Sequence, residues 1–188
     1  TQPKDFNTLV RLSGFSHGTD VWLGNAKDLI LEQGIPVTST VGCRDDIMLY
    51  LISMGLDPKM SFKIMESVRK GKVKKGGFEA GWREAMEEHE VPEWYIESLA
   101  KIGYLFPKAH AAAYVMMAYR IAYCKVYYPL AYYAAFFSIR ASAFSYEIMC
   151  QGRDKLEYYL ADYKKRADTL TKKEQDQIRD MKIVQEMY

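Results

Sequence analysis

Apolar residues recur at helical spacing along most of the 188-residue chain, and the alternation typical of half-buried strands is almost absent. Glycine, proline and N-cap residues divide this pattern into segments of helical length. The expected helices cover approximately residues 20–34, 44–54, 58–71, 78–90, 92–103, 108–128 and 129–139, with further helices after residue 145 and a last one that begins at a capping box, Thr171–Glu174. The pattern therefore predicts an all-α, irregular multi-helix domain of about nine helices that forms a single unit over residues 1–188.

Composition narrows the class of protein. Apolar residues make up 49 % of the chain and aromatic residues 14 %, which excludes a disordered polypeptide. The three cysteines are far apart and form no CxxC pair, so we expect neither a disulfide framework nor a thiolate zinc site. Charged residues interrupt the longest apolar stretch, residues 109–135, and no signal peptide opens the chain. We expect a cytoplasmic protein without a membrane span, and a sequence that begins and ends in mid-pattern suggests a piece of a larger protein.

The region from Ser98 to Tyr146 contains no Asp or Glu over 49 residues. Its basic residues are Lys101, Lys108, Arg120, Lys125 and Arg140. A cationic, aromatic helix without acids favours contact with a polyanion. The alternative is a buried apolar helix whose basic side chains extend to water at its ends.

Charge is also segregated in the middle of the chain. Residues 59–75 hold seven basic residues and one acid, whereas residues 79–97 hold seven acids and one arginine. These segments predict a positive surface followed by a negative one, or two solvated helix faces that attract each other. The acidic segment could also dock another protein, through Glu84, Glu87 and Glu88.

No constellation for catalysis is visible. Asp45 and Asp46 are adjacent, but they fall in the first turn of an expected helix, where acids interact favourably with the helix dipole, so we expect a structural role for them. The three histidines are dispersed, and residues 71–77 lack the order of a phosphate-binding P-loop. We therefore predict no catalytic residue and no metal ligand in this chain.

Helical phase groups several residues of the acid-free region. His110, Tyr114 and Lys125 fall within about 60° of one another around a helix, and Arg120 lies roughly 120° from Tyr114. Lys108 is at the expected start of the helix, where free N–H groups favour a phosphate. This arrangement predicts a site for phosphate oxygens with an aromatic ring for a sugar or base, although packing in the core is the alternative for Tyr114.

Several sequence strings resemble one polymerase family. The strings are SGFSHGTDVW (residues 13–22), GCRDDIM (42–48), GLDP (55–58), FKIMESVRKGK (62–72) and FPKAHAAAYV (106–115). Together they resemble the PolC-type replicative DNA polymerase III alpha subunit, a C-family polymerase, over residues 6–140. In that family the region is the fingers domain, and the metal-binding aspartates belong to the palm, which would lie upstream of this chain.

The resemblance implies a role in templated nucleotidyl transfer. A primer 3′-hydroxyl would attack the α-phosphate of a dNTP, with Mg²⁺ held by palm residues outside the chain. Residues 1–140 would bind nucleotide and DNA, and residues 141–188 would form C-terminal helices. The predicted nucleotide-binding residues are Arg44, Lys108, His110, Tyr114 and Arg120; the predicted DNA-binding residues are Lys63, Lys70, Lys72, Lys74, Lys75 and Lys125.

The expected partners are primer-template DNA, dNTP, the palm domain and other replisome proteins, with no membrane. The chain alone is expected to be inactive, because the palm is absent, and to hold no cofactor itself. The alternative function is a helical module that binds nucleic acid or a replisome protein and has no part in nucleotide chemistry. A dependence of binding on dNTP would distinguish the two functions.

Overall fold

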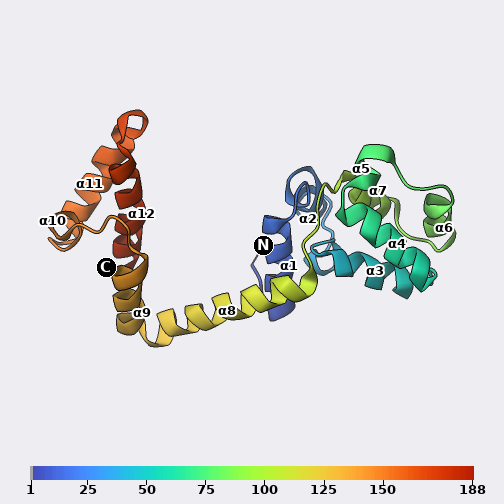
Figure 1. The fold of residues 1–188 in the computed structure, drawn as a ribbon, viewed down its shortest axis with the longest axis horizontal. Coiled ribbons are helices and arrows are strands. Elements are labelled where there is room, and N and C mark those ends of the chain that lie inside the picture. Colours follow the sequence, from blue (N-terminus) through green and yellow to red (C-terminus); the bar gives the residue numbers. More distant parts are fainter. Residues whose placement is uncertain (1) are drawn as a thin grey trace. The chain divides into compact units, whose positions relative to one another are not determined.

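The computed structural model describes residues 2–188, and it contains helices and no β-strand over that range. Contacts between residues group the chain into two compact units, unit 1 (Thr1–Ala118) and unit 2 (Tyr119–Tyr188). Figure 1 colours the ribbon by residue number, so each unit can be followed along it. The all-α prediction is confirmed, although the described residues form twelve α-helices and the predicted number was about nine. The assignment of residues 1–188 to a single fingers domain stays a prediction.

Unit 1 is built from seven helices and the first part of an eighth. These are α1 (Phe6–His17), α2 (Lys27–Leu31), α3 (Arg44–Ser53), α4 (Pro58–Arg69), α5 (Lys72–Gly76), α6 (Trp82–Glu88), α7 (Glu93–Lys101) and α8 (Lys108–Tyr127). The pair α3 and α4 packs side by side, joined by a turn at Gly55, which has a φ of +98°. Asp57 caps α4 by accepting from the Met60 amide, and Pro58 follows in the first turn, as the sequence predicted.

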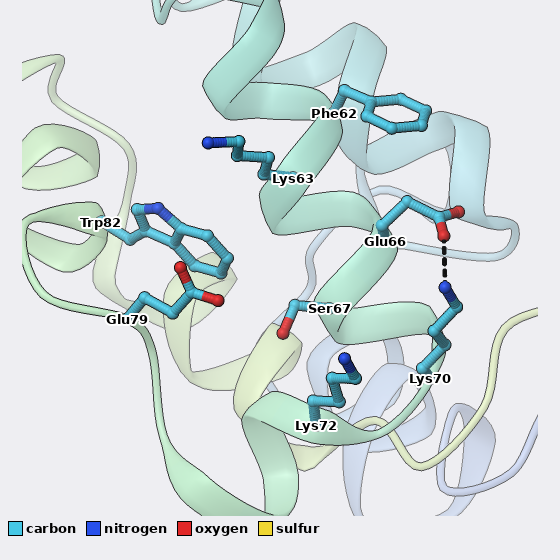
Figure 2. A pocket seen from close by; sticks show the side chains of 8 residues that line it. All are labelled: Phe62, Lys63, Glu66, Ser67, Lys70, Lys72, Glu79 and Trp82. Carbon is cyan, nitrogen blue, oxygen red and sulfur yellow. Dashed lines mark ion pairs between the residues drawn. The ribbon is translucent and has the colours of Figure 1, made fainter.

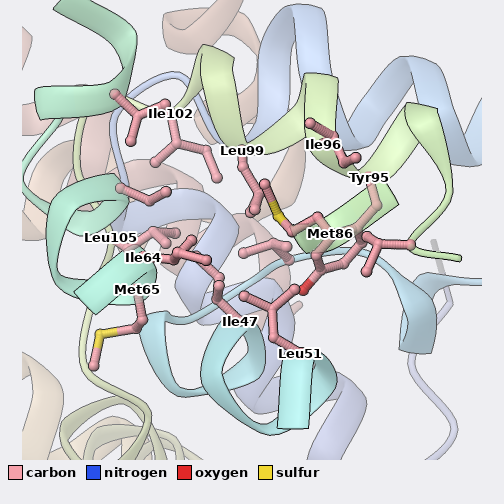
Figure 3. Close-up of a cluster of buried hydrophobic side chains, with 14 of the residues drawn as sticks. Ile47, Leu51, Ile64, Met65, Met86, Tyr95, Ile96, Leu99, Ile102 and Leu105 are labelled. Carbon is pink, nitrogen blue, oxygen red and sulfur yellow. The ribbon is translucent and has the colours of Figure 1, made fainter. Parts of the chain in front are cut away.

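The core of unit 1 lies between α3, α4 and α7 (Figure 3). Apolar side chains spaced three and four residues apart on these helices meet there and are fully buried. They include Ile47, Leu51, Ile64, Ile96 and Leu99. This core holds α3 and α4 together, and these helices carry two of the candidate functional residues, Arg44 and Lys63.

Unit 2 contains the second half of α8, then α9 (Pro129–Ala135), α10 (Tyr146–Met149), α11 (Arg153–Lys165) and α12 (Lys172–Met187). A looser helical turn, Phe136–Arg140, extends α9. A small core forms from Met149, Leu156, Tyr163, Met181 and Val184. The predicted capping box at Thr171 and Glu174 is present at the start of α12.

The prediction was wrong near the N-terminus. Helix α1 was not expected; it begins because the Asp5 side chain accepts from the Thr8 amide. The helix expected over residues 20–34 is interrupted at residues 23–25, where Gly24 has a φ of +70° and the backbone is not helical. Only Lys27–Leu31 remains as a regular α-helix in that segment.

Two glycines allow α1 to contact the loop before α3 at backbone distance. A β-carbon on Gly14 would overlap the Gly42 carbonyl oxygen, and one on Gly42 would lie 2.5 Å from the Cγ atom of Arg11. Neither position has room for a side chain. This close approach places Arg11 of α1 beside the first turn of α3.

Within the described residues, no helix is both long enough and apolar enough to cross a membrane.

Candidate functional site

The start of α8 is attached to the start of α3. The Arg44 amide donates to the Phe106 carbonyl at 3.1 Å, and the Lys108 amide donates to Asp45 Oδ2 at 2.8 Å. Asp45 thus caps α8 from another helix. Its carboxylate accepts from one of the free N–H groups that were expected to bind a phosphate. The result brings Arg44 and Lys108, two of the predicted nucleotide-binding residues, to one junction.

Asp46 is the centre of the polar network at this junction, and its side chain is 8 % exposed. Its Oδ2 atom accepts from the amides of Gly42 and Cys43 at 3.1 and 2.9 Å, and lies 3.2 Å from Arg11 Nη1. Its Oδ1 atom accepts from Lys108 Nζ at 3.0 Å. The expectation of a structural role for Asp45 and Asp46 agrees with these contacts, since both carboxylates hold backbone amides in place.

The guanidinium of Arg44 has no tight partner among the described residues. Its Nε lies 3.8 Å from Asp45 Oδ2, its Nη1 lies 3.9 Å from Glu66 Oε1, and Nε is buried without a hydrogen bond. These separations exceed ordinary hydrogen-bond lengths. Arg44 therefore retains donors for an anionic ligand.

Glu66 is the single acid among the basic residues of α4. It accepts from Arg69 Nε and Nη2, the latter at 3.1 Å, and from Lys70 Nζ at 2.8 Å. The hydrogen bonds from Arg69 and then Lys70 lower the pKa of Glu66 to about 2. Glu66 is therefore ionised at neutral pH and holds Arg69 and Lys70 on one side of α4.

Four aromatic rings follow one another from α1 to α8. His17 and Phe106 have ring centroids 5.3 Å apart, Phe106 and His110 5.0 Å, and His110 and Tyr114 4.6 Å. The predicted proximity of His110 and Tyr114 is thus present. Tyr114 is 58 % exposed, so it is not a core residue. The interpretation of the acid-free region as a buried helix is wrong, because Ala111 is the single buried residue in the described α8.

Two predicted site residues, Arg120 and Lys125, belong to unit 2. Lys125 forms an ion pair with Glu186, which also accepts from the Tyr133 hydroxyl at 2.8 Å. The Lys125 Nζ lies 5.7 Å from the centre of the Tyr132 ring. Arg120 is exposed on α8. The structure therefore places Lys125 in a set of contacts within unit 2.

An open groove of about 370 Å³ brings together three of the predicted DNA-binding lysines, Lys63, Lys70 and Lys72. Figure 2 shows them on α4 and at the start of α5, with the aromatic rings of Phe62 and Trp82 on the same lining. Lys70 bonds to Glu66, whereas Lys63 and Lys72 form no ion pair with any described residue.

The other two lysines of the basic segment differ from each other. Lys74 is bound to Asp20, with its Nζ 2.7 Å from Oδ2, whereas Lys75 is exposed and forms no ion pair with residues 2–188. The structure thus collects part of the predicted DNA-binding set in one groove and leaves Lys74 and Lys75 outside its lining.

Over residues 2–188, no three His, Cys, Asp or Glu side chains are grouped so that they could hold a metal ion. The contacts of Asp46 with two cations and two amides leave its oxygens unsuited to a metal.

Sequence reasoning missed Arg11 and Trp82. Arg11 reaches Asp46 from a helix 35 positions earlier in the chain, and local spacing carries no signal for such a contact. Trp82 belongs to the acidic segment, residues 79–97, in which charged residues form the dominant pattern. The one available signal was the position of Trp82 directly after Gly81, the residue that precedes α6.

Comparison with known proteins identifies the family. Residues 1–90 match the bacterial DNA polymerase III alpha subunit finger domain. The whole chain is 53 % identical over 191 residues to the DNA polymerase III PolC-type of Streptococcus thermophilus strain LMD-9. The chain corresponds over its whole length to a segment of PolC-type DNA polymerase III. The PolC-type enzyme of Staphylococcus aureus is 52 % identical over 187 residues, again with 100 % of this chain covered.

The chain spans 13 % of the length of these PolC-type relatives. The resemblance deduced from the motifs is confirmed, and the finger-domain match includes four of the five motif strings.

Proposed function

We propose that this chain binds the incoming dNTP and the primer-template DNA for a PolC-type DNA polymerase, with nucleotidyl transfer carried out by palm aspartates outside it. The observation that carries the proposal is the junction of α3 and α8, which brings Arg44 and Lys108 together from positions 64 residues apart. Two cations of different geometry, with the exposed Tyr114 further along α8, suit a nucleoside triphosphate. Cytoplasmic location and contact with other replisome proteins belong to the same proposal.

Arg44 is the residue best prepared to meet a triphosphate. Its guanidinium is half-exposed, is loosely paired at 3.8 and 3.9 Å, and retains a buried Nε without a partner. A phosphate oxygen would satisfy that donor through a charge-assisted hydrogen bond. Lys108 would have to exchange its bond to Asp46 for one to the nucleotide, and His110 and Tyr114 would contact phosphate and deoxyribose or base. Arg120 stays a predicted triphosphate ligand on the resemblance alone.

The groove of Figure 2 supports contact with DNA. Lys63 and Lys72 have free ammonium groups for backbone phosphates, and the exposed ring of Phe62 can stack on a base. Backbone contacts of this kind do not depend on sequence, which templated synthesis requires. Lys70, Lys74, Lys75 and Lys125 would add contacts after exchange of their present partners or directly from solvent.

Two Mg²⁺ ions would supply Lewis-acid activation of the phosphates in the parent enzyme. The carboxylates of this chain do not fit that role, because Asp45 caps α8 and Asp46 is bound by four donors. We assign no metal ligand to the chain and expect no polymerase activity from it alone.

The test is steady-state and single-turnover kinetics of the full-length polymerase that contains this chain. Arg44→Ala and Lys108→Ala should each raise the dNTP KM or lower kcat about tenfold or more, since hydrogen bonds to charged groups contribute about 1.5–3 kcal/mol. The matched control is Lys63→Ala with Lys72→Ala, which should weaken DNA binding, reduce its salt dependence and leave the dNTP KM unchanged.

Wild-type kinetics in both Arg44→Ala and Lys108→Ala would reject the nucleotide assignment. Loss of DNA binding with no dNTP effect in any variant would favour the alternative, a helical nucleic-acid or protein-binding module. Thermal unfolding of each variant separates these results from a loss of folded protein, which is a concern for Lys108 because it neutralises Asp46.

A further inference from the structure

A second cavity in unit 1 has the character of an anion site. It has a volume of about 330 Å³ and lies between α1, residues 38–40, the exposed side of α3, α7 and the start of α8. The residues that matter to its chemistry are Arg11, Thr38, Ser39, Asp46, Tyr95 and Lys108. Of these, the proposed nucleotide site uses Lys108 alone.

The buried hydroxyl of Tyr95 lacks a partner there. Tyr95 is 1 % exposed and contributes to the cavity lining, yet its oxygen has no hydrogen bond to any described residue. Figure 3 shows its ring among the core side chains of α3 and α7. Burial and the nearby Asp46 raise its pKa well above the ordinary value, so the hydroxyl stays protonated and is a donor without an acceptor.

Asp46 does not satisfy this donor, because two amides, Arg11 and Lys108 already occupy its oxygens. The charged residues in the cavity lining are Arg11, Lys108 and Asp46, which leaves a surplus of one positive charge. Thr38 and Ser39 add hydroxyl groups at the solvent side. The lining therefore offers a guanidinium, an ammonium and hydroxyls, which is a donor set for an oxyanion.

The size of the cavity argues for more than a trapped water. One water occupies about 30 Å³ of liquid volume, far less than this space. We propose that the cavity binds a phosphate group, with Tyr95, Arg11 and Lys108 as its donors. The group would come from pyrophosphate or a free nucleotide, or from the backbone of DNA. The proposal goes beyond the proposed function, since it depends neither on Arg44 nor on the groove lined by Lys63, Lys70 and Lys72.

The test is titration of the 188-residue chain with inorganic pyrophosphate in one arm and a short single-stranded oligonucleotide in the other. NMR follows the amides of Thr38 and Ser39, and calorimetry gives Kd. In the wild type we expect saturable binding with shifts at both amides. Tyr95→Phe should raise Kd about tenfold, as expected for loss of a hydrogen bond to a charged group. Tyr163→Phe, which removes a buried hydroxyl in unit 2, is the matched control and should bind as wild type.

The two arms identify the source of the phosphate. A Tyr95→Phe effect with pyrophosphate indicates a free phosphate ligand, and an effect with the oligonucleotide alone indicates a backbone phosphate. Equal affinities of wild type and Tyr95→Phe in both arms, or no shift at Thr38 and Ser39, would overturn the proposal. None of these results changes the outcome of the kinetic test of Arg44→Ala. Arg11→Lys, which keeps the charge beside Asp46, provides a second variant if Tyr95→Phe folds poorly.

Discussion

At the scale of single residues, Glu66 organises the positive surface of α4. It is 22 % exposed and accepts from Arg69 and Lys70 in the lining of the groove of Figure 2. Without this carboxylate, three basic side chains, Arg69 and Lys70 at the end of α4 and Arg44 at the start of α3, would lack their shared anion. Glu66 therefore stabilises the arrangement of cations that the proposed function requires.

Glu66 should make the free energy of unfolding of unit 1 depend on pH in the acid range. Its pKa is about 2 in the folded chain and 4.5 ordinarily, so its contribution is complete above pH 4.5 and is lost as pH falls through 2. After allowance for solvent screening, the contribution is about 1 kcal/mol. Urea unfolding followed between pH 6 and 2.5 should show a flatter pH dependence for Glu66→Gln than for the wild type. Glu88→Gln, at an exposed and unpaired site, is the control, and an identical slope in all three proteins would contradict the assignment.

At the scale of elements, the loop before α3 holds three helices together. Arg11 of α1, the amides before α3 and Lys108 of α8 all bind the carboxylate of Asp46. One side chain therefore contributes both to the packing of α1 against α3 and to the junction of α3 with α8. Directed changes there should affect both stability and the proposed nucleotide site.

Asp46→Ala should lower the free energy of unfolding of unit 1 by about 3 kcal/mol, because it leaves two cations and two amides without their acceptor. Asp57→Ala removes an exposed helix cap and should cost about 1 kcal/mol. Chemical denaturation of both variants measures the difference. A cost for Asp46→Ala no larger than that for Asp57→Ala would show that solvent replaces the network.

At the scale of the whole molecule, each of the two units has its own main apolar core. All three tryptophans, Trp22, Trp82 and Trp94, belong to unit 1, whereas unit 2 has none. Tryptophan fluorescence therefore reports on unit 1, and far-UV circular dichroism reports on the helices of both units. The two signals can be compared in one urea titration.

Leu156→Ala, at a fully buried position of unit 2, should cost about 2–5 kcal/mol there. We expect the circular dichroism transition to acquire an early phase while the fluorescence midpoint remains unchanged. Leu99→Ala, its counterpart in the core of unit 1, should shift the fluorescence midpoint instead. A shift of both signals by Leu156→Ala would show that the units unfold together.

Sequence predicted those features that local chemistry determines. Asp57 with Pro58 and Thr171 with Glu174 are helix starts that short stretches specify by themselves. The positive surface expected over residues 59–75 is present in part, since Lys63, Lys70 and Lys72 line one groove. Such features depend on neighbours within a few positions, so a pattern contains them.

Features made by distant contacts were not predictable in this way. Helix α1 contains Gly14, which disfavours a helix by propensity but is required by contact with the loop before α3. Asp46 binds the side chains of Arg11 and Lys108, and Asp45 accepts a hydrogen bond from the Lys108 amide. These contacts join residues that are 35 to 63 positions apart in the sequence. Tertiary structure alone makes these pairs, and the phase of one helix could not show them.

The contact between Gly14 and Gly42 limits how the protein can vary. Because backbone atoms or a stem carbon of Arg11 fill the space where either β-carbon would stand, any substitution at these positions separates α1 from the first turn of α3. In a library randomised at residues 14 and 42, replicating clones should retain glycine at both. A double replacement should not rescue a single one, since two added side chains need more room than one.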